Sequence, residues 1–471
     1  MTILTLEAST ASAKAMIYDS EKGPIKLITE HYDKARGDIS AYDADDVYDA
    51  MISAGKKAAD GFQPDVVALG GTWHSLLACD ENMQPVTPTY SWAYVGAAKD
   101  AAEIRANKEL TNELYNQTGC MVHGIYPLYK LLHLKHEGMD LKKHYFFGQG
   151  SYNFFKMTGE RLTSESMASG SAMLNTHDKR YNEMSLSLVG INENQLPLVT
   201  TYKESRPLLK EVADELGIRP GIPVTLPHPD GALNQVGAGA LEKGIMTLSV
   251  GTSGAIRLST DMPILPKNKS TWCYLAPEKW LSGAATSGAT NCVDWFISTV
   301  NSKRYSYGDL EKMIQNREKA PVFLPFISGE RCPGWHDSRL ATFHNLAADT
   351  TIGDMYYAVL EGVLFNLYHC YNELINISGK PDIIRVSGGV CKSALWLGML
   401  TDIWQADIEI SDIEQASMLG AAVLGMYTAG VITDLTEYKV VTDKILKPDK
   451  KAADFYAARF EKYMKAYNSF E

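Results

Sequence analysis

An internal repeat is the feature of this sequence that most limits the folds open to it. Residues 5–19 (TLEASTASAKAMIYD) align without a gap with residues 247–261 (TLSVGTSGAIRLSTD). Each copy predicts a strand, a tight turn of small and hydroxyl residues, and a second strand. A second pair of segments, DVVALGGTWHS (65–75) and DIIRVSGGVCKS (382–393), follows in the same order. We therefore expect two copies of one α/β unit that face each other.

The length of the chain and the spacing of its apolar residues agree with a two-domain α/β protein. At 471 residues the chain exceeds what one hydrophobic core usually serves. Short β-branched runs alternate with helical apolar spacing, which is clearest at 110–118 and 355–377. A helix of small residues is also expected at 232–241, and ASMLGAAVLG (416–425) predicts a closely packing helix face. We place the two domains at residues 1–240 and 241–471.

Composition excludes several classes of protein. The formal net charge is −11 and no long basic run is present, which argues against nucleic acid or an anionic membrane surface as a partner. No apolar run approaches the ~20 residues that span a bilayer, and no signal peptide is visible. The seven cysteines are scattered without CxxC or paired metal spacing, which predicts reduced thiols and a cytoplasmic protein. An anionic substrate would need local hydrogen-bond donors to hold it in this acidic chain.

The two repeated turns suggest a ligand. Backbone N–H groups in a tight turn of small residues form a concave anion site, to which Thr and Ser hydroxyls add donors. Two such turns on duplicated domains can hold a polyphosphate from opposite sides of the cleft between them. The sequence has no GxxxxGK[ST] string and no GxGxxG that opens a helix after a strand, so P-loop and Rossmann folds are disfavoured.

The order of motifs along the chain carries a family resemblance. The motifs include EASTASAK (7–14), GGTWHSLLACDENMQPVTPTYSW (70–92), PDGALNQVGAGALEKGIMTLSVGTSGAIR (229–257), FLPFISGERCPGWHDSRLATFHNL (323–346) and VSGGVCKSALWLGMLTDIW (386–404). In this order the chain resembles the FGGY carbohydrate kinases of the actin-like, hexokinase-like ATPase superfamily. The resemblance implies an α/β fold of two actin-like (ribonuclease H-like) domains flanking an interdomain cleft. It also implies an N-terminal sugar-binding domain, a C-terminal nucleotide-binding domain, and phosphorylation of a sugar by ATP with Mg²⁺.

The resemblance gives the Pro-Asp-Gly string at 229–231 a role. Alone, such a string is typical of a turn. In the family, an Asp at the position of Asp230 is the general base that takes the proton of the attacking sugar hydroxyl. Trp73, His74 and Gly231 stand where the family binds the sugar, together with Asp230.

The resemblance also implies residues for the nucleotide and the metal ion. Glu7 stands where the family has an Asp that helps to hold Mg²⁺ through water. The residues expected to bind ATP are Ser9, Thr10 and Lys14 in the first turn, Gly251, Thr252 and Ser253 in the second, and Gly388 and Gly389 near the adenosine.

Departures from the family pattern leave the reaction open. Glu7 replaces the usual Asp, Ser9 replaces Gly, and Ala11 replaces Thr, so phosphate binding is either re-engineered or impaired. The favoured reaction is the conversion of gluconate to 6-phosphogluconate, in which His74, His123 or a nest of backbone amides would bind the substrate carboxylate. The alternatives are a xylulose or related ketose or polyol kinase and a catalytically silent sugar- or nucleotide-binding homologue. An actin-like assembly ATPase is disfavoured, and a homodimer stays open.

Overall fold

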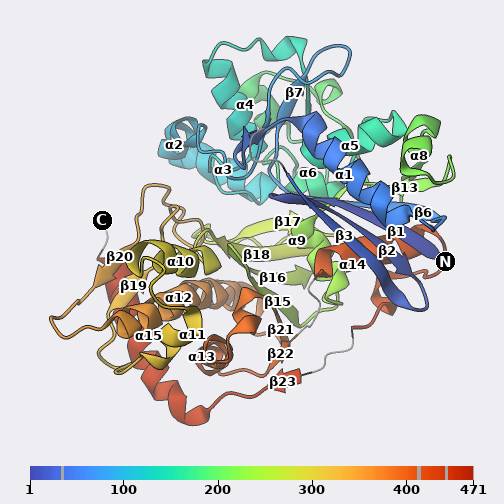
Figure 1. Cartoon of the computed structure of the whole chain (residues 1–471). Coiled ribbons are helices and arrows are strands. Elements are labelled where there is room, and N and C mark those ends of the chain that lie inside the picture. Colours follow the sequence, from blue (N-terminus) through green and yellow to red (C-terminus); the bar gives the residue numbers. More distant parts are fainter. Residues whose placement is uncertain (33–36, 411–414, 441–443, 470–471) are drawn as a thin grey trace.

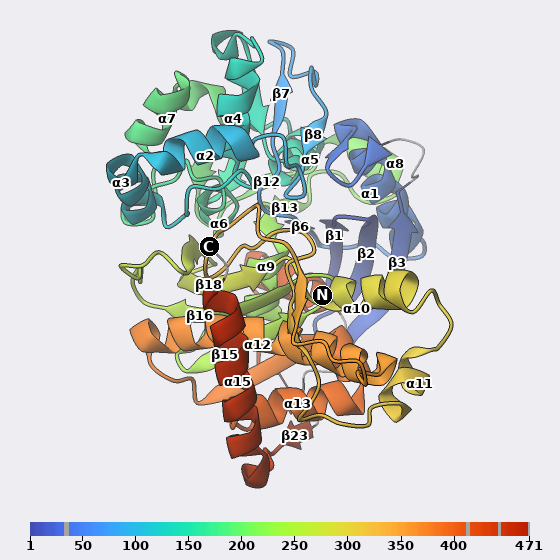
Figure 2. The same cartoon turned by 90° about the vertical axis from the view of Figure 1, so that its left-hand side faces the viewer.

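The computed structural model describes residues 1–32, 37–410, 415–440 and 444–469, and it contains two seven-stranded sheets. In both views the two halves lie one above the other, with helix α9 (Asp230–Gly237) between them (Figures 1 and 2). The first sheet has the order β12 (Ser205–Pro207), β13 (Pro223–Thr225), β6 (Val66–Gly71), β1 (Thr2–Ala8), β2 (Ser12–Asp19) and β3 (Gly23–His31), and β14 (His228–Pro229) also pairs with β6. The second sheet has the order β17 (Trp272–Leu275), β18 (Trp280–Thr286), β16 (Gly254–Thr260), β15 (Ile245–Val250), β21 (Ile383–Gly388), β22 (Ile408–Ile410) and β23 (Lys444–Leu446).

The strand pairing confirms the internal repeat. Strand β1 runs antiparallel to β2 and parallel to β6, and β15 runs antiparallel to β16 and parallel to β21. At the ends of these strands Ala8 lies opposite Gly71 in the first sheet, and Val250 lies opposite Gly388 in the second. Both predicted pairs of repeated segments therefore occupy equivalent strands of two sheets of the same topology.

Helices and short strands complete the two halves. The expected helices at 110–118 and 355–377 are confirmed as parts of α3 and α12, whereas α9 begins and ends earlier than the expected 232–241. The remaining helices are α1 (Ala44–Ala59), α2 (Ala98–Ala106), α3 (Lys108–Thr118), α4 (Pro127–His136), α5 (Gln149–Thr158), α6 (Glu165–Ser169), α7 (Glu183–Val189), α8 (Lys210–Leu216), α10 (Thr290–Trp295), α11 (Tyr307–Lys312), α12 (Ile352–Ser378), α13 (Ala394–Trp404), α14 (Ala416–Thr428) and α15 (Ala453–Asn468). The short strands are β4 (Gly37–Asp38), β5 (Ala41–Tyr42), β7 (Leu77–Cys79), β8 (Thr89–Tyr90), β9 (Tyr145–Phe147), β10 (Leu162–Ser164), β11 (Leu198–Thr200), β19 (Val322–Leu324) and β20 (Thr342–His344).

Helices α9 and α14 cross with their backbones in contact. A Cβ built on Gly237 would lie 2.0 Å from the carbonyl oxygen of Ala416, and one on Gly420 would lie 2.0 Å from that of Leu233. Helix α14 also packs on β1 and β6 of the first sheet, although along the chain it lies between β22 and β23 of the second (Figure 1). The prediction of a close-packing helix face at 416–425 is thereby confirmed.

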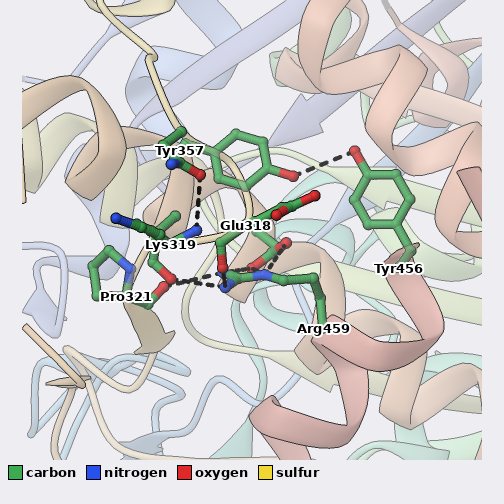
Figure 3. A network of polar contacts seen from close by, with 9 residues as sticks. Glu318, Lys319, Pro321, Tyr357, Tyr456 and Arg459 are labelled. Atoms are coloured by element: carbon green, nitrogen blue, oxygen red, sulfur yellow. Dashed lines mark hydrogen bonds and ion pairs between the residues drawn. The ribbon is translucent and has the colours of Figure 1, made fainter. Parts of the chain in front are cut away.

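A buried arginine attaches the C-terminal helix α15 to its neighbours. The guanidinium of Arg459, which is labelled in Figure 3, pairs with the carboxylate of Glu361 on α12 at 2.5 Å. The two side chains are only 3% and 2% exposed. Arg459 also donates to the carbonyl oxygens of Ala320 (2.7 Å) and Pro321 (3.2 Å), which precede β19. Burial raises the pKa of Glu361, and the neighbouring Arg459 opposes this shift. The pair therefore depends on both partners being present.

No disulfide joins any of the seven cysteines, all of which lie in the described residues, and six of them are buried. Among the helices of the described residues, none combines the length and the apolar character needed to cross a membrane.

We predict that Arg459→Ala lowers the free energy of unfolding by about 3–5 kcal/mol, because Glu361 would remain as a buried charge without its partner. Chemical denaturation of the full chain, followed by circular dichroism, measures the change. The matched control is Lys439→Ala, which removes an exposed ion pair with Glu242 (3.0 Å). That variant should lose less than about 1 kcal/mol. Equal losses in the two variants would show that the Arg459 pair contributes nothing special.

Candidate active site

A cavity between the two halves brings together four of the residues singled out above, Trp73, His74, Asp230 and Ser253, whereas the other predicted site residues are not part of its lining. The first half contributes Thr72, Trp73, His74, Trp92 and Asp230 to its lining. The second half contributes Ser253, Gly254, Ala255, Arg257, Trp272, Tyr274, Ala285 and Arg331. Strand β14 pairs with the end of β6, so that Asp230 at the start of α9 lies close to the loop that carries Trp73 and His74.

Asp230 faces the cavity as the first residue of α9, where the positive end of the helix dipole favours a negative charge. One carboxylate oxygen accepts the N–H of Gly231 at 2.8 Å. Solvent reaches the side chain through the cavity, but the surrounding protein still desolvates it and raises its pKa. The positive charges of Arg257 and Lys14 oppose that rise. The result is a carboxylate that is accessible, ionisable and more basic than an ordinary surface Asp.

Gly231 lies directly behind two residues of the cavity wall, Trp73 and Arg257, and leaves no space there for a side chain. A Cβ at this position would lie 2.4 Å from the ring of Trp73 and 3.0 Å from the guanidinium of Arg257. The Trp73 ring is fixed from behind, since its Nε1–H donates to the carbonyl oxygen of Ser166 at 2.8 Å. It also packs against Tyr274 of the second half, with ring centroids 5.0 Å apart. The backbone of α9 and this aromatic wall therefore determine each other's position.

His74 has a defined tautomer. Its Nδ1 lies 2.6 Å from the carbonyl oxygen of Gly170, which can only accept, so Nδ1 carries the proton. Burial and the nearby charge of Arg331 lower the pKa of His74 well below its usual value, which keeps the ring neutral. Its Nε2 is therefore an acceptor. The backbone of His74 adopts φ of +69°, a left-handed conformation that is uncommon outside glycine.

Lys130 stabilises this conformation and was not singled out from the sequence. Its side chain is fully buried, and Nζ donates to the carbonyl oxygens of His74 and Ser91, both at 2.5 Å, and of Tyr90 at 3.3 Å. One nitrogen thus joins the loop at His74 to the end of β8 and the residue that follows it. The residue lies in a helix whose apolar spacing gave no sign of this role.

The two repeated turns lie at the ends of β1 and β15. In the first turn the Ser9 hydroxyl donates to the carbonyl oxygen of Ser12 at 2.7 Å, so the hydroxyl that replaces the family's glycine is used within the turn. Thr10 accepts the indole N–H of Trp92 at 3.0 Å. In the second turn the N–H of Gly251 donates to the carbonyl oxygen of Ser253 at 3.0 Å. Thr252 is exposed at this turn.

Gly388 and Gly389 lie next to the second turn. Gly388 has φ of +96°, and a Cβ on it would lie 2.5 Å from the carbonyl oxygen of Val250. A Cβ on Gly389 would lie 2.8 Å from Thr290 at the start of α10. Both glycines are therefore required by the close approach of neighbouring backbone and side chains.

Glu7 on β1 is buried beside Lys14 and α14, and one of its carboxylate oxygens is unsatisfied. Its side chain is 3% exposed, and its Oε2 has no hydrogen-bond partner among the described residues. Lys14, opposite it on β2, approaches Oε1 only to 3.9 Å and instead donates to Gln415 at 3.0 Å. Burial raises the pKa of Glu7, and Lys14 opposes the shift. Such a buried acceptor is suited to receive a cation or its bound water.

Comparison with known proteins assigns the family. The model of the FGGY carbohydrate kinase N-terminal domain matches residues 2–237, and the model of the C-terminal domain matches residues 246–429. The chain belongs to the FGGY family of carbohydrate kinases. It is therefore an enzyme that phosphorylates a sugar, with ATP as the phosphate donor of the family.

Relatives and solved structures agree with this assignment. A gluconokinase of Bacillus subtilis is 27% identical over 94% of this kinase and 90% of the relative, and a xylulose kinase of Staphylococcus xylosus is 24% identical over 89% of each chain. A ligand-bound xylulose kinase and a gluconate kinase, both of Lactobacillus acidophilus, each superpose with a TM-score of 0.93 at 25% identity, covering 99% of this kinase and 98% of the other chain. The expected fold of two actin-like domains is confirmed.

Two arginines in the cavity of the kinase were not singled out from the sequence, although both lie within the quoted motifs. Arg257 belongs to GTSGAIR, and its Nη1 donates to Ser249 at 3.3 Å. Arg331 belongs to the GERCPGW string after β19. The Nε atoms of both are buried without a hydrogen-bond partner among the described residues.

His123 does not have the role considered for it. The N–H of Ile125 donates to its Nδ1 at 3.1 Å, and its Nε2 bonds to the carboxylate of Asp337. Both ring nitrogens are thus occupied by protein, and His123 is absent from the cavity lining. The expectation that it could bind a substrate carboxylate is wrong because a partner distant in sequence takes its only N–H.

We predict that Gly231→Ala raises the KM for the sugar by roughly tenfold, because the new methyl group must displace Trp73 or Arg257 from the cavity wall. The KM for ATP should change little. The control is Gly398→Ala on α13, where a Cβ meets no atom within 4 Å. This control should keep its kinetic constants and gain up to about 1 kcal/mol of stability, since Ala favours a helix. An unchanged sugar KM in Gly231→Ala would contradict the assignment of the wall.

Proposed function

We propose that the kinase transfers the γ-phosphoryl group of ATP to gluconate, yielding 6-phosphogluconate, with Asp230 as general base. The observation that carries the proposal is the cavity between the halves, which presents one accessible carboxylate and two guanidinium groups among aromatic walls. Gluconokinases of Bacillus subtilis and Bacillus licheniformis, each 27% identical to this kinase, support the same substrate.

The reaction places specific demands on Asp230. The substrate hydroxyl oxygen attacks the γ-phosphorus, its proton passes to the Asp230 carboxylate, and the bond to the bridging oxygen of ADP breaks. A pKa raised by desolvation makes Asp230 a stronger base, while Arg257 and Lys14 favour its ionised form. His74 Nε2 can accept a hydrogen bond from another hydroxyl, and Trp73 and Tyr274 exclude water from one side.

The charge of the cavity favours a sugar acid. When Asp230 is ionised, its charge and those of Arg257 and Arg331 leave one positive charge uncompensated, in a chain whose net charge is −11. Arg257 lowers the pKa of Asp230, whereas Arg331 lowers the pKa of His74 and of Arg257. In gluconate the carboxylate and the phosphorylated hydroxyl are at opposite ends. In this proposal Arg331 binds the carboxylate while Asp230 meets the hydroxyl.

A xylulose kinase is the second candidate. It is favoured by the ligand-bound xylulose kinase of L. acidophilus, whose TM-score equals that of the gluconate kinase. A neutral ketose would leave the positive charge of Arg331 unmatched in the cavity, which is the reason to prefer the acid. The silent homologue is disfavoured because the Ser9 hydroxyl bonds within its own turn instead of occupying the place of a phosphate.

The proposal divides the site between the halves. Residues 1–240 would supply most of the sugar contacts, and residues 241–471 most of the nucleotide contacts. Ser9, Thr10 and Lys14 would hold the ATP phosphates from one side and Gly251, Thr252 and Ser253 from the other, with Gly388 and Gly389 near the adenosine. These roles fit two turns whose backbones end the equivalent strands β1 and β15.

The residues present fit a Mg²⁺ ion held largely by water and phosphate. In the part of the chain that the structure describes, no cluster of three or more His, Cys, Asp or Glu side chains could enclose a metal. Glu7 offers one buried, unpartnered carboxylate oxygen. Mg²⁺ commonly uses one or two carboxylates together with substrate phosphates, which it would neutralise here.

The proposed function predicts the highest kcat/KM for gluconate among gluconate, xylulose, ribulose and glycerol in a coupled assay of ADP release. Asp230→Asn should lower kcat by about 10²–10⁴-fold and leave calorimetric binding of sugar and ATP nearly intact, because only the proton acceptor is lost. The control is Asp214→Asn, which alters an exposed ion pair with Lys210. A higher kcat/KM for a neutral sugar would overturn the gluconate assignment. Comparable turnover of Asp230→Asn and the control would exclude Asp230 as the base, and inactivity of the wild type towards every sugar would favour the silent homologue.

We also predict that Glu7→Gln raises the Mg²⁺ concentration for half-maximal activity by roughly tenfold, since one charge near the ion is removed while the shape is kept. Calorimetric titration of Mg²⁺ into the kinase with ADP should show the same loss of affinity. Glu109→Gln, on the exposed face of α3, serves as the control. Identical Mg²⁺ dependence in the two variants would remove Glu7 from the metal site.

A further inference from the structure

The loop at residues 329–339 carries Arg331 and joins the two halves of the kinase. On the side of the first half, Arg105 of α2 donates to the carbonyl oxygen of Trp335 at 2.8 Å and pairs with Asp337 at 2.6 Å. His123 bonds to the other carboxylate oxygen of Asp337. Both oxygens of Asp337 are thus held by residues within the N-terminal family domain, although Asp337 lies in the C-terminal one. We call Arg105, His123 and Asp337 the clasp.

The other end of the loop is anchored in the second half. Glu330 is 1% exposed and accepts from Arg339 at 2.8 Å and from the hydroxyl of Tyr467 on α15 at 2.6 Å. The N–H of Cys332 donates to the carbonyl oxygen of Ala285 at 3.1 Å. Within the loop, the N–H of Trp335 donates to the carbonyl oxygen of Arg331 at 2.6 Å. Arg331 therefore lies between two anchors, one on each half.

The clasp is ionic over the whole useful pH range. Because Nδ1 of His123 accepts the Ile125 N–H, its proton is on Nε2 and faces Asp337. Hydrogen bonds from His123 and Arg105, whose guanidinium is also positive, hold the pKa of Asp337 at about 2 despite its burial. The other titratable groups that act on His123 and on neighbouring His336 are Arg331 and Arg339, which are positive. Because the pKa of Asp337 is depressed, its ionised form stabilises the fold at every pH above the ordinary pKa of Asp. This stabilisation is lost as the pH falls from there through about 2.

The halves do not depend on the clasp to stay together. Tyr115 donates to the carbonyl oxygen of Thr271 at 2.8 Å, and the indole of Trp280 donates to that of Thr176 at 2.7 Å. The N–H of Leu275 donates to the Ser169 hydroxyl at 3.0 Å. These bonds join β17 and β18 to the first half near the same cavity. Loss of the clasp should therefore release the loop and leave the domains in place.

We propose that Arg105 and Asp337 are positioning residues for substrate recognition, which hold Arg331 where its guanidinium meets the carboxylate of a sugar acid. The proposal rests on the proposed function, in which the substrate is anionic. Arg331 remains in the chain when the clasp is broken but loses its fixed orientation. The effect of Arg105 on substrate binding therefore depends on Arg331. The loss falls on binding of the sugar acid and spares ATP and the chemical step.

A double-mutant cycle on the full-length kinase at pH 7.5 tests this coupling. Arg105→Ala and Arg331→Ala should each raise the KM for gluconate by about tenfold or more, with kcat and the KM for ATP changed by less than about twofold. In the Arg331→Ala background, Arg105→Ala should add less than about twofold, because its effect passes through Arg331. Arg105→Lys should restore part of the affinity by keeping the charge but not the bidentate geometry.

The matched control is Arg219→Ala, which breaks another ion pair of the first half, with Asp65 at 2.8 Å. It should leave every kinetic constant unchanged, and thermal melting of all variants checks that they fold. If Arg105→Ala fails to fold, Asp337→Asn replaces it, because this substitution keeps the size of the side chain. It should raise the KM for gluconate in the same way. Multiplicative effects of Arg105 and Arg331, or an equal rise in the KM for ATP, overturn the inference and leave the gluconate assignment intact. A wild-type preference for a neutral sugar overturns both.

Discussion

Two glycines allow α9 and α14 to cross with their backbones in contact, and this crossing fixes the two halves of the kinase against each other. Gly237 and Gly420 each meet a carbonyl oxygen of the opposite helix, so neither position has space for a side chain. Helix α9 begins with Asp230, and α14 begins beside Gln415. The side-chain oxygen of Gln415 accepts a hydrogen bond from the ammonium of Lys14. The same contact therefore sets both the candidate base and the polar groups around Glu7. A shift of either helix would move the chemistry, because packed backbones cannot slide by fractions of an ångström without clashes.

Buried charges of the kinase lie both in ion pairs and around the cavity. Away from the cavity, Arg459 pairs with Glu361 and Arg339 pairs with Glu330. Around the cavity, Glu7, Arg257 and Arg331 keep buried polar atoms without partners. Leaving such atoms unpaired is costly unless a ligand completes them. Two of these residues, Arg257 and Arg331, line the same cavity of an acidic protein, which agrees with a site for an anionic ligand.

The particular successes and errors of sequence interpretation have physical reasons. The repeated strands and the small-residue face at 416–425 were predictable, because strand pairing and close helix packing depend on local residue types. The limits of α9 were not, since Asp230 starts the helix only because β14 pairs with β6 in front of it. His123 was misjudged because its partner Asp337 is far away in the chain. Lys130, Arg257 and Arg331 had no local pattern that separated them from ordinary residues of a helix, a strand and a loop, respectively.

By itself, the sequence determined the duplicated α/β architecture, the family, and the motif that contains Asp230, because repeats and motif order are properties of the chain. Tertiary structure alone decided which charged groups meet. Arg105 and Asp337 are 232 residues apart, yet they form one ion pair, and Arg331 reaches the cavity from the opposite half to His74. Such contacts depend on how two separately formed sheets dock. Docking is set by summed packing over the whole interface, which no short segment encodes.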